Sequence, residues 1–237
     1  MRKIRLLPII SCIVFLSFTE NAKSKESKNT QQKPKSDRDK ISYFIGQQVG
    51  RSIKGLEVNL EVFSNSLRSV IEGKKSLLTE EELRDASVLL QGNIQAKAQQ
   101  ISAENLKKGN AYLAENKKKK GVMTTESGLQ YEILAEGKGK SPSNTSTVKV
   151  HYRGTHLDGT VFDSSYKRNQ PAEFPVNGVI PGWTEALKLM KEKSKWRLHI
   201  PASLAYGPNP RPGIPGNSVL IFEVELLEVT DKENKKG

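Results

Sequence analysis

The 237-residue sequence has one cysteine, Cys12, and few aromatic residues, which make up only 6% of the chain. Because Cys12 lies close to the N-terminus, the remaining chain can form no disulfide and use no cysteine nucleophile. The sequence also lacks a G-x-S-x-G nucleophile elbow, a phosphate-binding loop and the Rossmann glycine pattern. These absences exclude the common nucleophilic and nucleotide-dependent enzymes.

The sequence has only three histidines, His151, His156 and His199, and their spacing to acidic residues is not that of metal ligands. Two of them alternate with lysine or arginine in strand-like runs, which predicts surface positions. We therefore expect neither a metal site nor any cofactor.

The net charge of +12 raises the question of nucleic-acid binding. The lysines are dispersed over residues 23–40, 117–120 and 232–236, and no basic strip is interleaved with the aromatic residues that stack on bases. We therefore expect no nucleic-acid partner and interpret the lysines as a solvated surface. Attraction to an anionic membrane surface is the alternative.

Residues 1–22 resemble an export signal. A basic start precedes a largely apolar stretch over residues 6–18, which is too short for a comfortable transmembrane helix. This pattern predicts a protein of the periplasm, the outer membrane or the cell surface. Ordinary secretion is the favoured interpretation, and a lipid anchor on Cys12 is the alternative.

Residues 23–36 read as a flexible linker, and residues 37–120 have a helical period. Residues 37–78 carry two short amphipathic stripes, consisting of Ile41, Phe44, Ile45, Val49 and Ile53, and of Val62, Phe63, Leu67, Val70 and Ile71. Thr79 and Glu82 form a capping box that starts a long helix over residues 79–120. Its second half is so polar that it is expected to be a solvated spacer. Helices as short as the first two are marginal alone, which predicts a homodimer through residues 37–100. A monomeric three-helix bundle is the alternative.

Residues 121–230 change to a period of two, and residues 231–237 form a polar tail. Three runs, at residues 148–153, 195–200 and 220–227, alternate apolar with mainly polar residues, and Asp158-Gly159 is a hairpin signal. One short helix interrupts the strands. It starts at Pro181, continues into Trp183 and carries Ala186, Leu187 and Met190 on one stripe. The expected fold is therefore α+β, with an antiparallel sheet and one short helix.

Four segments together resemble the FKBP-type peptidyl-prolyl cis-trans isomerases: 150-VHYRGTHLDGTVFDSS-165, 178-GVIPGW-183, 205-AYG-207 and 219-VLIFEVELLEV-229. The N-terminal half, including 109-GNAYLAENKKKKGVMTTESGLQYEIL-134, is similar to the helical dimerisation region of the macrophage infectivity potentiator branch. The resemblance implies a five-stranded antiparallel half-barrel wrapped around the short helix, with a prolyl-binding pocket between them.

By this resemblance, eight residues are expected to form the catalytic pocket: Tyr152, Phe162, Asp163, Val179, Ile180, Trp183, Tyr206 and Phe222. Three further residues, Phe174, Arg211 and Ile214, are expected to bind substrate. Ile180 would offer its backbone N–H and Tyr206 its hydroxyl to substrate carbonyls. Asp163 is expected to orient and to act electrostatically, although it is also placed to cap the turn that follows it.

Two departures from the family pattern concern the walls of this pocket. Ala172 stands where small members have an aromatic residue, and the loop at residues 207–218 is one residue shorter. The resemblance implies proline-containing polypeptide clients and a site for macrolide inhibitors, whose affinity depends on these walls. The predicted function is an exported prolyl isomerase that assists folding. A non-catalytic dimeric chaperone or surface-interaction protein is the alternative.

Overall fold

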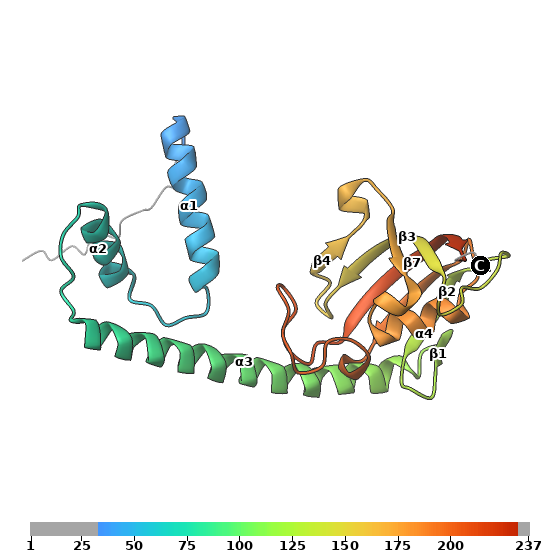
Figure 1. Cartoon of the computed structure of the whole chain (residues 1–237). Coiled ribbons are helices and arrows are strands. Elements are labelled where there is room, and N and C mark those ends of the chain that lie inside the picture. Colours follow the sequence, from blue (N-terminus) through green and yellow to red (C-terminus); the bar gives the residue numbers. More distant parts are fainter. Residues whose placement is uncertain (1–32, 232–237) are drawn as a thin grey trace, which may run out of the picture. The chain divides into compact units, whose positions relative to one another are not determined.

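The structure is a computed structural model that describes residues 33–231. Three helices come first in the described chain: α1 (Asp37–Ile53), α2 (Leu60–Ile71) and α3 (Glu80–Asn116) (Figure 1). The chain divides into two units, residues 1–55 and residues 56–237, so that α1 belongs to one unit and all later elements to the other. The predicted export signal, Cys12, most of the linker and nearly all of the polar tail lie outside the described residues.

Each of the three helices starts at a polar N-cap residue. The side chains of Ser36 and Asn59 accept hydrogen bonds from the first backbone amides of α1 and α2. Thr79 caps α3, and its backbone N–H is in turn bonded by Glu82, which confirms the predicted capping box. The first helix therefore starts at Asp37, directly after its cap Ser36.

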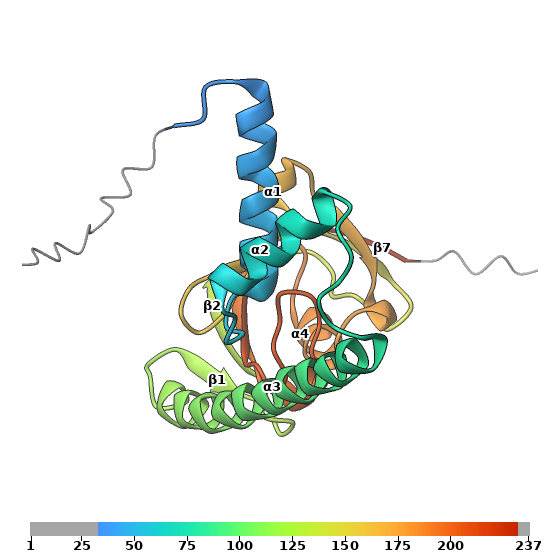
Figure 2. The same cartoon turned by 90° about the vertical axis from the view of Figure 1, so that its left-hand side faces the viewer.

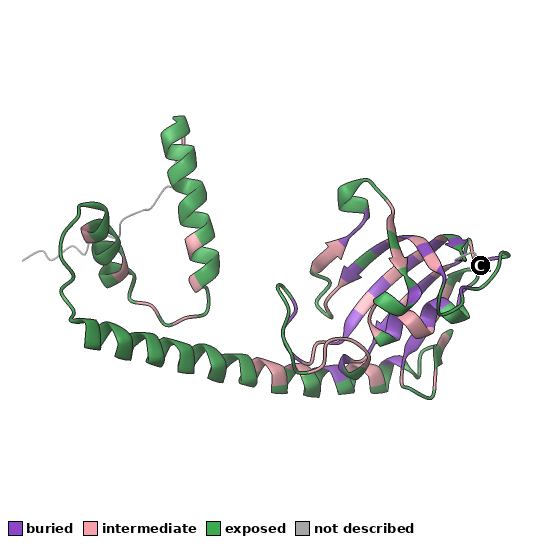
Figure 3. Cartoon of the chain, viewed as in Figure 1, coloured by how far each residue is buried: buried purple, intermediate pink, exposed green. Residues whose placement is uncertain are grey.

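The apolar stripes of α1 and α2 are exposed. Neither helix contains a buried residue, and Phe44 and Val70 are 61% and 72% exposed. In Figure 3 both helices are mostly coloured as exposed, with a few intermediate positions, and the first half of α3 is exposed, whereas the buried positions gather in the sheet and in the helix that the sheet surrounds.

The second half of the chain forms one antiparallel sheet. Its strands are β1 (Val122–Thr124), β2 (Gln130–Ala135), β3 (Thr147–Thr155), β4 (Val161–Ser164), β5 (Ala172–Pro175), β6 (Lys195–Ile200) and β7 (Leu220–Thr230). The strand order is β1-β2-β6-β7-β3-β4, and β5 also pairs with β3. The predicted α+β class is confirmed. The described sheet has seven strands and not five, because β1 adds a short hairpin strand and a 3-10 helix interrupts the chain between β4 and β5.

Helix α4 (Pro181–Leu189) packs against the sheet and completes the core. Pro181 occupies the first helical turn, and Trp183, Ala186, Leu187 and Met190 are all buried, as the stripe predicted. The inward residues of β3, β6 and β7 cover the other side of this core, and Val148, Leu198 and Val224 are at most 1% exposed. The period-two pattern therefore predicted the correct face of each strand. The Asp158-Gly159 turn is also present, with φ of 83° at Gly159.

The second half of α3 is not a solvated spacer, which corrects the expectation from sequence. It lies against the sheet domain (Figures 1 and 2), and Gly109 and Asn116 are buried. The contacts are made mainly by polar side chains and a glycine. An apolar stripe in the sequence is the usual sign that a helix packs, and these residues do not contribute to one. The helix also ends at Asn116, before the lysine run.

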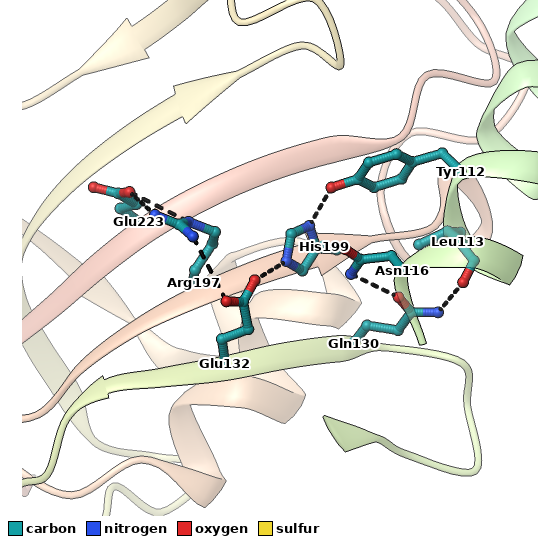
Figure 4. A network of polar contacts seen from close by, with 8 residues as sticks. All are labelled: Tyr112, Leu113, Asn116, Gln130, Glu132, Arg197, His199 and Glu223. Carbon is teal, nitrogen blue, oxygen red and sulfur yellow. Dashed lines mark hydrogen bonds and ion pairs between the residues drawn. The ribbon is translucent and has the colours of Figure 1, made fainter. Parts of the chain in front are cut away.

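The surface position expected for His199 is also wrong, because α3 covers the outer face of β6 (Figure 4). His199 is 2% exposed, and its ring lies 2.9 Å from the Tyr112 hydroxyl and 2.8 Å from Glu132. Burial lowers the pKa of His199, although the hydrogen bond with Glu132 opposes the shift. A neutral ring donates from Nε2 to the carboxylate and accepts at Nδ1 from the tyrosine, which satisfies both nitrogens.

Among residues 33–231, no helix is both long enough and apolar enough to span a bilayer.

Helix α4 offers a matched test of the core. Leu187 is fully buried, whereas Leu189 in the same helix is 47% exposed. Replacing Leu187 with alanine should cost about 2–5 kcal/mol, because it removes buried methyl groups and leaves a cavity. Replacing Leu189 should cost less than about 1 kcal/mol. Urea unfolding measures both values, and equal losses would contradict the placement of α4.

Candidate functional site

The candidate site is a cavity of about 700 Å³ between the sheet and the start of α4. All eleven residues selected from the sequence line it: Tyr152, Phe162, Asp163, Phe174, Val179, Ile180, Trp183, Tyr206, Arg211, Ile214 and Phe222. Gly178 and Pro212 also line it and were not selected. Residues from seven separate segments of the chain thus meet at one opening, and only the fold brings them together.

Trp183 lies at the centre of the aromatic lining. The rings of Tyr152, Phe174 and Phe222 approach it edge-on, with centroid distances of 5.4, 5.8 and 5.2 Å and interplanar angles of 84–87°. Edge-to-face packing of this kind is favourable and fixes ring orientation. The indole is 4% exposed and held from several sides, so it provides a rigid apolar surface.

The Pro-Gly-Trp start of α4 has a packing reason at each position. Pro181 needs no hydrogen-bond acceptor in the first turn. A Cβ on Gly182 would come within 2.6 Å of Ile200 Cγ2, so only glycine allows α4 to approach β6 this closely. The close approach places Trp183 over the core, where a smaller side chain would leave a void.

Gly154 on β3 has a similar role on the opposite wall. A Cβ there would lie 2.7 Å from atoms of both Phe162 and Phe222. The absence of a side chain lets these two rings meet at 5.5 Å with an interplanar angle of 89°. The aromatic wall therefore depends on a glycine that the sequence pattern did not identify.

Asp163 on β4 is held in a polar cluster at the edge of the cavity. The Tyr152 hydroxyl donates to Asp163 Oδ2 at 2.5 Å, and Arg168 donates to Oδ1 at 2.7 Å. Arg168 also donates to the Tyr152 hydroxyl at 2.8 Å, so the three side chains form a closed ring of hydrogen bonds. The backbone N–H of Ser164, the next residue in β4, donates to Oδ1 as well, at 2.7 Å.

Arg168 was missed by the sequence reasoning. It lies in the 3-10 helix η1 (Tyr166–Arg168), within an exposed segment where a basic residue carries no signal of its own. Partial burial on its own would raise the pKa of Asp163, but hydrogen bonds from Tyr152 and Arg168 and the charge of Arg168 lower it overall. Burial and the bond to Asp163 raise the pKa of the Tyr152 hydroxyl. At neutral pH the aspartate is therefore ionised and the tyrosine is protonated.

Three donors of cavity-lining residues have no partner within residues 33–231: the buried indole N–H of Trp183 and two groups at the border of the cavity. Ile180 is the N-cap of α4, and its backbone N–H has no acceptor among residues 33–231. The hydroxyl of Tyr206 likewise makes no hydrogen bond within the described chain, while its ring lies 5.7 Å from the Arg211 guanidinium. Both groups border an apolar cavity, so both can donate to a polar ligand that enters it.

The wall near Ala172 is filled from a neighbouring position. Ala172 packs against the core and does not line the cavity, whereas Phe174 lines it and contacts the edges of Trp183 and Tyr152. The loop at residues 207–218 contributes Arg211, Pro212 and Ile214 to the other side. Within residues 33–231 no group of three or more potential metal ligands comes together.

The sequence matches two family descriptions. Residues 138–227 match "FKBP-type peptidyl-prolyl cis-trans isomerase", and residues 38–133 match the "domain amino terminal to FKBP-type peptidyl-prolyl isomerase". The chain is 43% identical over 200 residues to the outer membrane protein MIP of Legionella longbeachae, covering 81% of this chain and 86% of the relative. It is 47% identical over 196 residues to the FKBP-type 22 kDa peptidyl-prolyl cis-trans isomerase of Escherichia coli K12, covering 79% and 93%.

The crystal structure of FkpA from Escherichia coli is also similar. It superposes with a TM-score of 0.62 at 38% identity and covers 83% of this chain and 98% of the FkpA chain. The chain belongs to the FKBP-type peptidyl-prolyl cis-trans isomerase family, and its activity is that of an isomerase. The predicted family and enzyme class are confirmed.

The cluster of Asp163, Tyr152 and Arg168 gives a pH prediction. Because the folded protein lowers the pKa of Asp163, this group stabilises the fold above the ordinary aspartate pKa, and the contribution is lost as pH falls through the lowered value. Arg168→Gln should raise the pKa of Asp163 towards its ordinary value. Carboxyl titration by NMR measures the change.

Lys167→Gln is the control for this experiment, because it removes the same charge from an exposed neighbour in η1. We expect it to leave the Asp163 titration almost unchanged. Equal shifts in the two variants would mean that overall charge, and not the bond from Arg168, holds the aspartate ionised.

Proposed function

We propose that the protein is exported and accelerates Xaa–Pro rotation in folding polypeptides by desolvating the twisted amide and holding it with a few hydrogen bonds. The observation that carries this proposal is the aromatic cavity, which has a rigid Trp183 floor and donors at its edge. The barrier to rotation is about 18–20 kcal/mol, because amide resonance is lost when the bond twists. The step breaks no bond and requires no nucleophile.

Desolvation is the first contribution. Water stabilises the polar planar amide more than the twisted one, so an apolar site favours the twisted state. The prolyl ring would lie on Trp183, between Tyr152, Phe174 and Phe222. These rings are locked by mutual edge contacts, so the cavity requires little rearrangement when the substrate binds.

Directed hydrogen bonds are the second contribution. The free N–H of Ile180 and the hydroxyl of Tyr206 would bind substrate carbonyls on either side of the rotating bond. Asp163 stays ionised within its ring of donors, so its role is to orient Tyr152 and to set the field at the cavity edge. It does not transfer a proton.

The proposed substrates are proline-containing polypeptides outside the cytoplasm. The relative from Legionella longbeachae is named an outer membrane protein, which supports an envelope location. Uncatalysed prolyl isomerisation takes tens of seconds or more, slow enough to limit folding. The same cavity is where a macrolide inhibitor would bind, with Phe174 taking the place of the aromatic side chain absent at Ala172.

A homodimer through residues 37–100 is also part of the proposal. The stripes of α1 and α2 expose large apolar side chains, and surfaces of this kind mark association sites. A dimer would present two cavities to one client polypeptide. Once the first cavity has bound the client, the second cavity is held close to it at a high effective concentration. The alternative function is a non-catalytic chaperone that binds proline-containing segments. The same surfaces would serve that function, and the two activities can coexist in one protein.

The mechanism is tested by isomerisation of an Xaa–Pro peptide in a protease-free assay. We expect clear acceleration by the wild type and a roughly 10-fold lower kcat/KM for Tyr206→Phe, the size of one lost hydrogen bond. Tyr166→Phe, an exposed tyrosine away from the cavity, should retain full activity. The rate should be constant between about pH 5 and 9.

Solvent deuterium separates this mechanism from acid–base catalysis. Rotation without proton transfer should give an isotope effect close to one, whereas an effect of about two or more would indicate proton transfer by Asp163 or Tyr206. A well-folded wild type without acceleration would overturn the proposed function and favour the chaperone.

The dimer is tested by light scattering at micromolar concentration. We expect a mass of twice the 26.4 kDa chain. Ile45→Asp places a charge near the centre of the exposed stripe of α1 and should shift the mass towards one chain. Gln47→Asp adds the same charge on the other side of the helix, two residues further on, and should not. A wild type of single-chain mass would remove the dimer from the proposal.

A further inference from the structure

The loop at residues 207–218 covers one side of the cavity. The Asn217 N–H donates to the Gly207 oxygen at 2.7 Å and closes its base, and His156 Nε2 lies 2.9 Å from the Gly213 oxygen near its tip. Within the loop, Arg211 and Ile214 exchange two backbone hydrogen bonds of 2.8 Å, which close a tight turn at the tip. Ile214 is buried in the cavity wall. Asn217 near the base has φ of 55°, a left-handed conformation that asparagine adopts more readily than most residues.

The base of this loop is bound by side chains of α3. Asn217 Nδ2 donates to Ser102 Oγ at 2.9 Å, and Asn105 Nδ2 donates to the backbone oxygen of Gly216 at 3.1 Å. Asn105 Nδ2 also lies 3.4 Å from Ser218 Oγ. These contacts join residues more than 100 positions apart in the sequence.

Gly109 continues the same contact one helical turn further along α3. A Cβ on Gly109 would come within 2.6 Å of Val219 Cγ2, and Val219 is 5% exposed. Only a glycine lets the helix lie this close to the end of the loop. The contacts that join α3 to the loop thus come from two short polar side chains and a bare backbone position, and Leu106 and Asn110 line the small pocket beside them.

The helix itself is fixed to the sheet, as Figure 4 shows. Tyr112 binds His199, and Asn116 Nδ2 donates to Gln130 Oε1 at 3.0 Å. Gln130 Nε2 in turn donates to the Leu113 carbonyl at 2.8 Å. Because one end of this segment is anchored to β2 and β6, the preceding turns are a rigid support for the loop.

We infer that Ser102, Asn105 and Gly109 of α3 are positioning residues for substrate recognition, because they hold the loop whose tip forms one wall of the prolyl cavity. Helix α3 then contributes to the substrate specificity of the isomerase domain, in addition to connecting this domain to the N-terminal helices. This inference rests on the proposed function, since it assigns the loop tip to substrate binding.

The experiment measures kcat and KM for an Xaa–Pro peptide in the full-length protein. Asn105→Ala should raise KM about 3- to 10-fold, the effect of losing one or two neutral hydrogen bonds, while kcat stays close to wild type because the Trp183 floor is untouched. Asn93→Ala is the matched control. Asn93 is exposed on the same helix away from the loop, and its side chain makes no hydrogen bond within residues 33–231. It should behave as wild type.

A double-mutant cycle with Ile214→Ala shows whether Asn105 acts through the loop tip. If it does, Asn105→Ala should have little further effect once Ile214 is truncated. Full additivity, an unchanged KM in Asn105→Ala, or no effect of Ile214→Ala alone would each overturn the inference. Gly109→Ala displaces Val219 without removing a hydrogen bond and should raise KM in the same way.

Hydrogen exchange distinguishes a failure of this inference from a failure of the proposed function. The amides of Arg211, Ile214 and Asn217 are hydrogen-bonded within the loop, and they should exchange faster in Asn105→Ala than in Asn93→Ala. Unchanged exchange would show that α3 does not hold the loop. An inactive wild type with the expected change in exchange would overturn the proposed function and the role of α3 in substrate recognition. It would still show that α3 holds the loop at residues 207–218.

Discussion

The packing of Trp183 against the sheet is the interaction on which the site depends. The indole is held by three rings that meet it edge-on, and these rings come from β3, β5 and β7. The arrangement requires that α4 approach β6 closely, which the bare backbone of Gly182 allows. Trp183 therefore belongs both to the floor of the cavity and to the hydrophobic core. A substitution of Trp183 would change the binding surface and the stability of the fold together.

Around this apolar floor the polar groups are few and restrained. Asp163 is the one carboxylate that lines the cavity within the described chain, and its charge is balanced by Arg168 and the Tyr152 hydroxyl. A carboxylate held in this way is ionised at neutral pH, because its pKa lies below its ordinary value. The proposed mechanism assigns to these groups an apolar enclosure, an orienting charge and two donors at the border of the cavity.

The docking of α3 changes how the two halves of the chain relate. The second half of α3 is polar, and it packs against the sheet through hydrogen bonds. Burying its polar side chains costs free energy unless each one finds a hydrogen-bond partner. His199, Asn116 and Gln130 supply these partners, and the helix then reaches the loop over the cavity. Polar docking of this kind specifies one register of the helix, since a shift by one residue would leave each buried group unpaired.

Local physics explains what the sequence determined by itself. The capping box at Thr79, the helix starting at Pro181, the inward faces of β3, β6 and β7 and the eleven cavity residues were all predicted, the last by resemblance to a family. What the tertiary structure alone decided is long-range: the pairing of Arg168 with Asp163, the burial of His199, and the contact of Gly109 with Val219. A polar side chain or a glycine has no periodic signature. Whether it is exposed or buried depends on which distant segment lies against it, and only the folded chain places that segment.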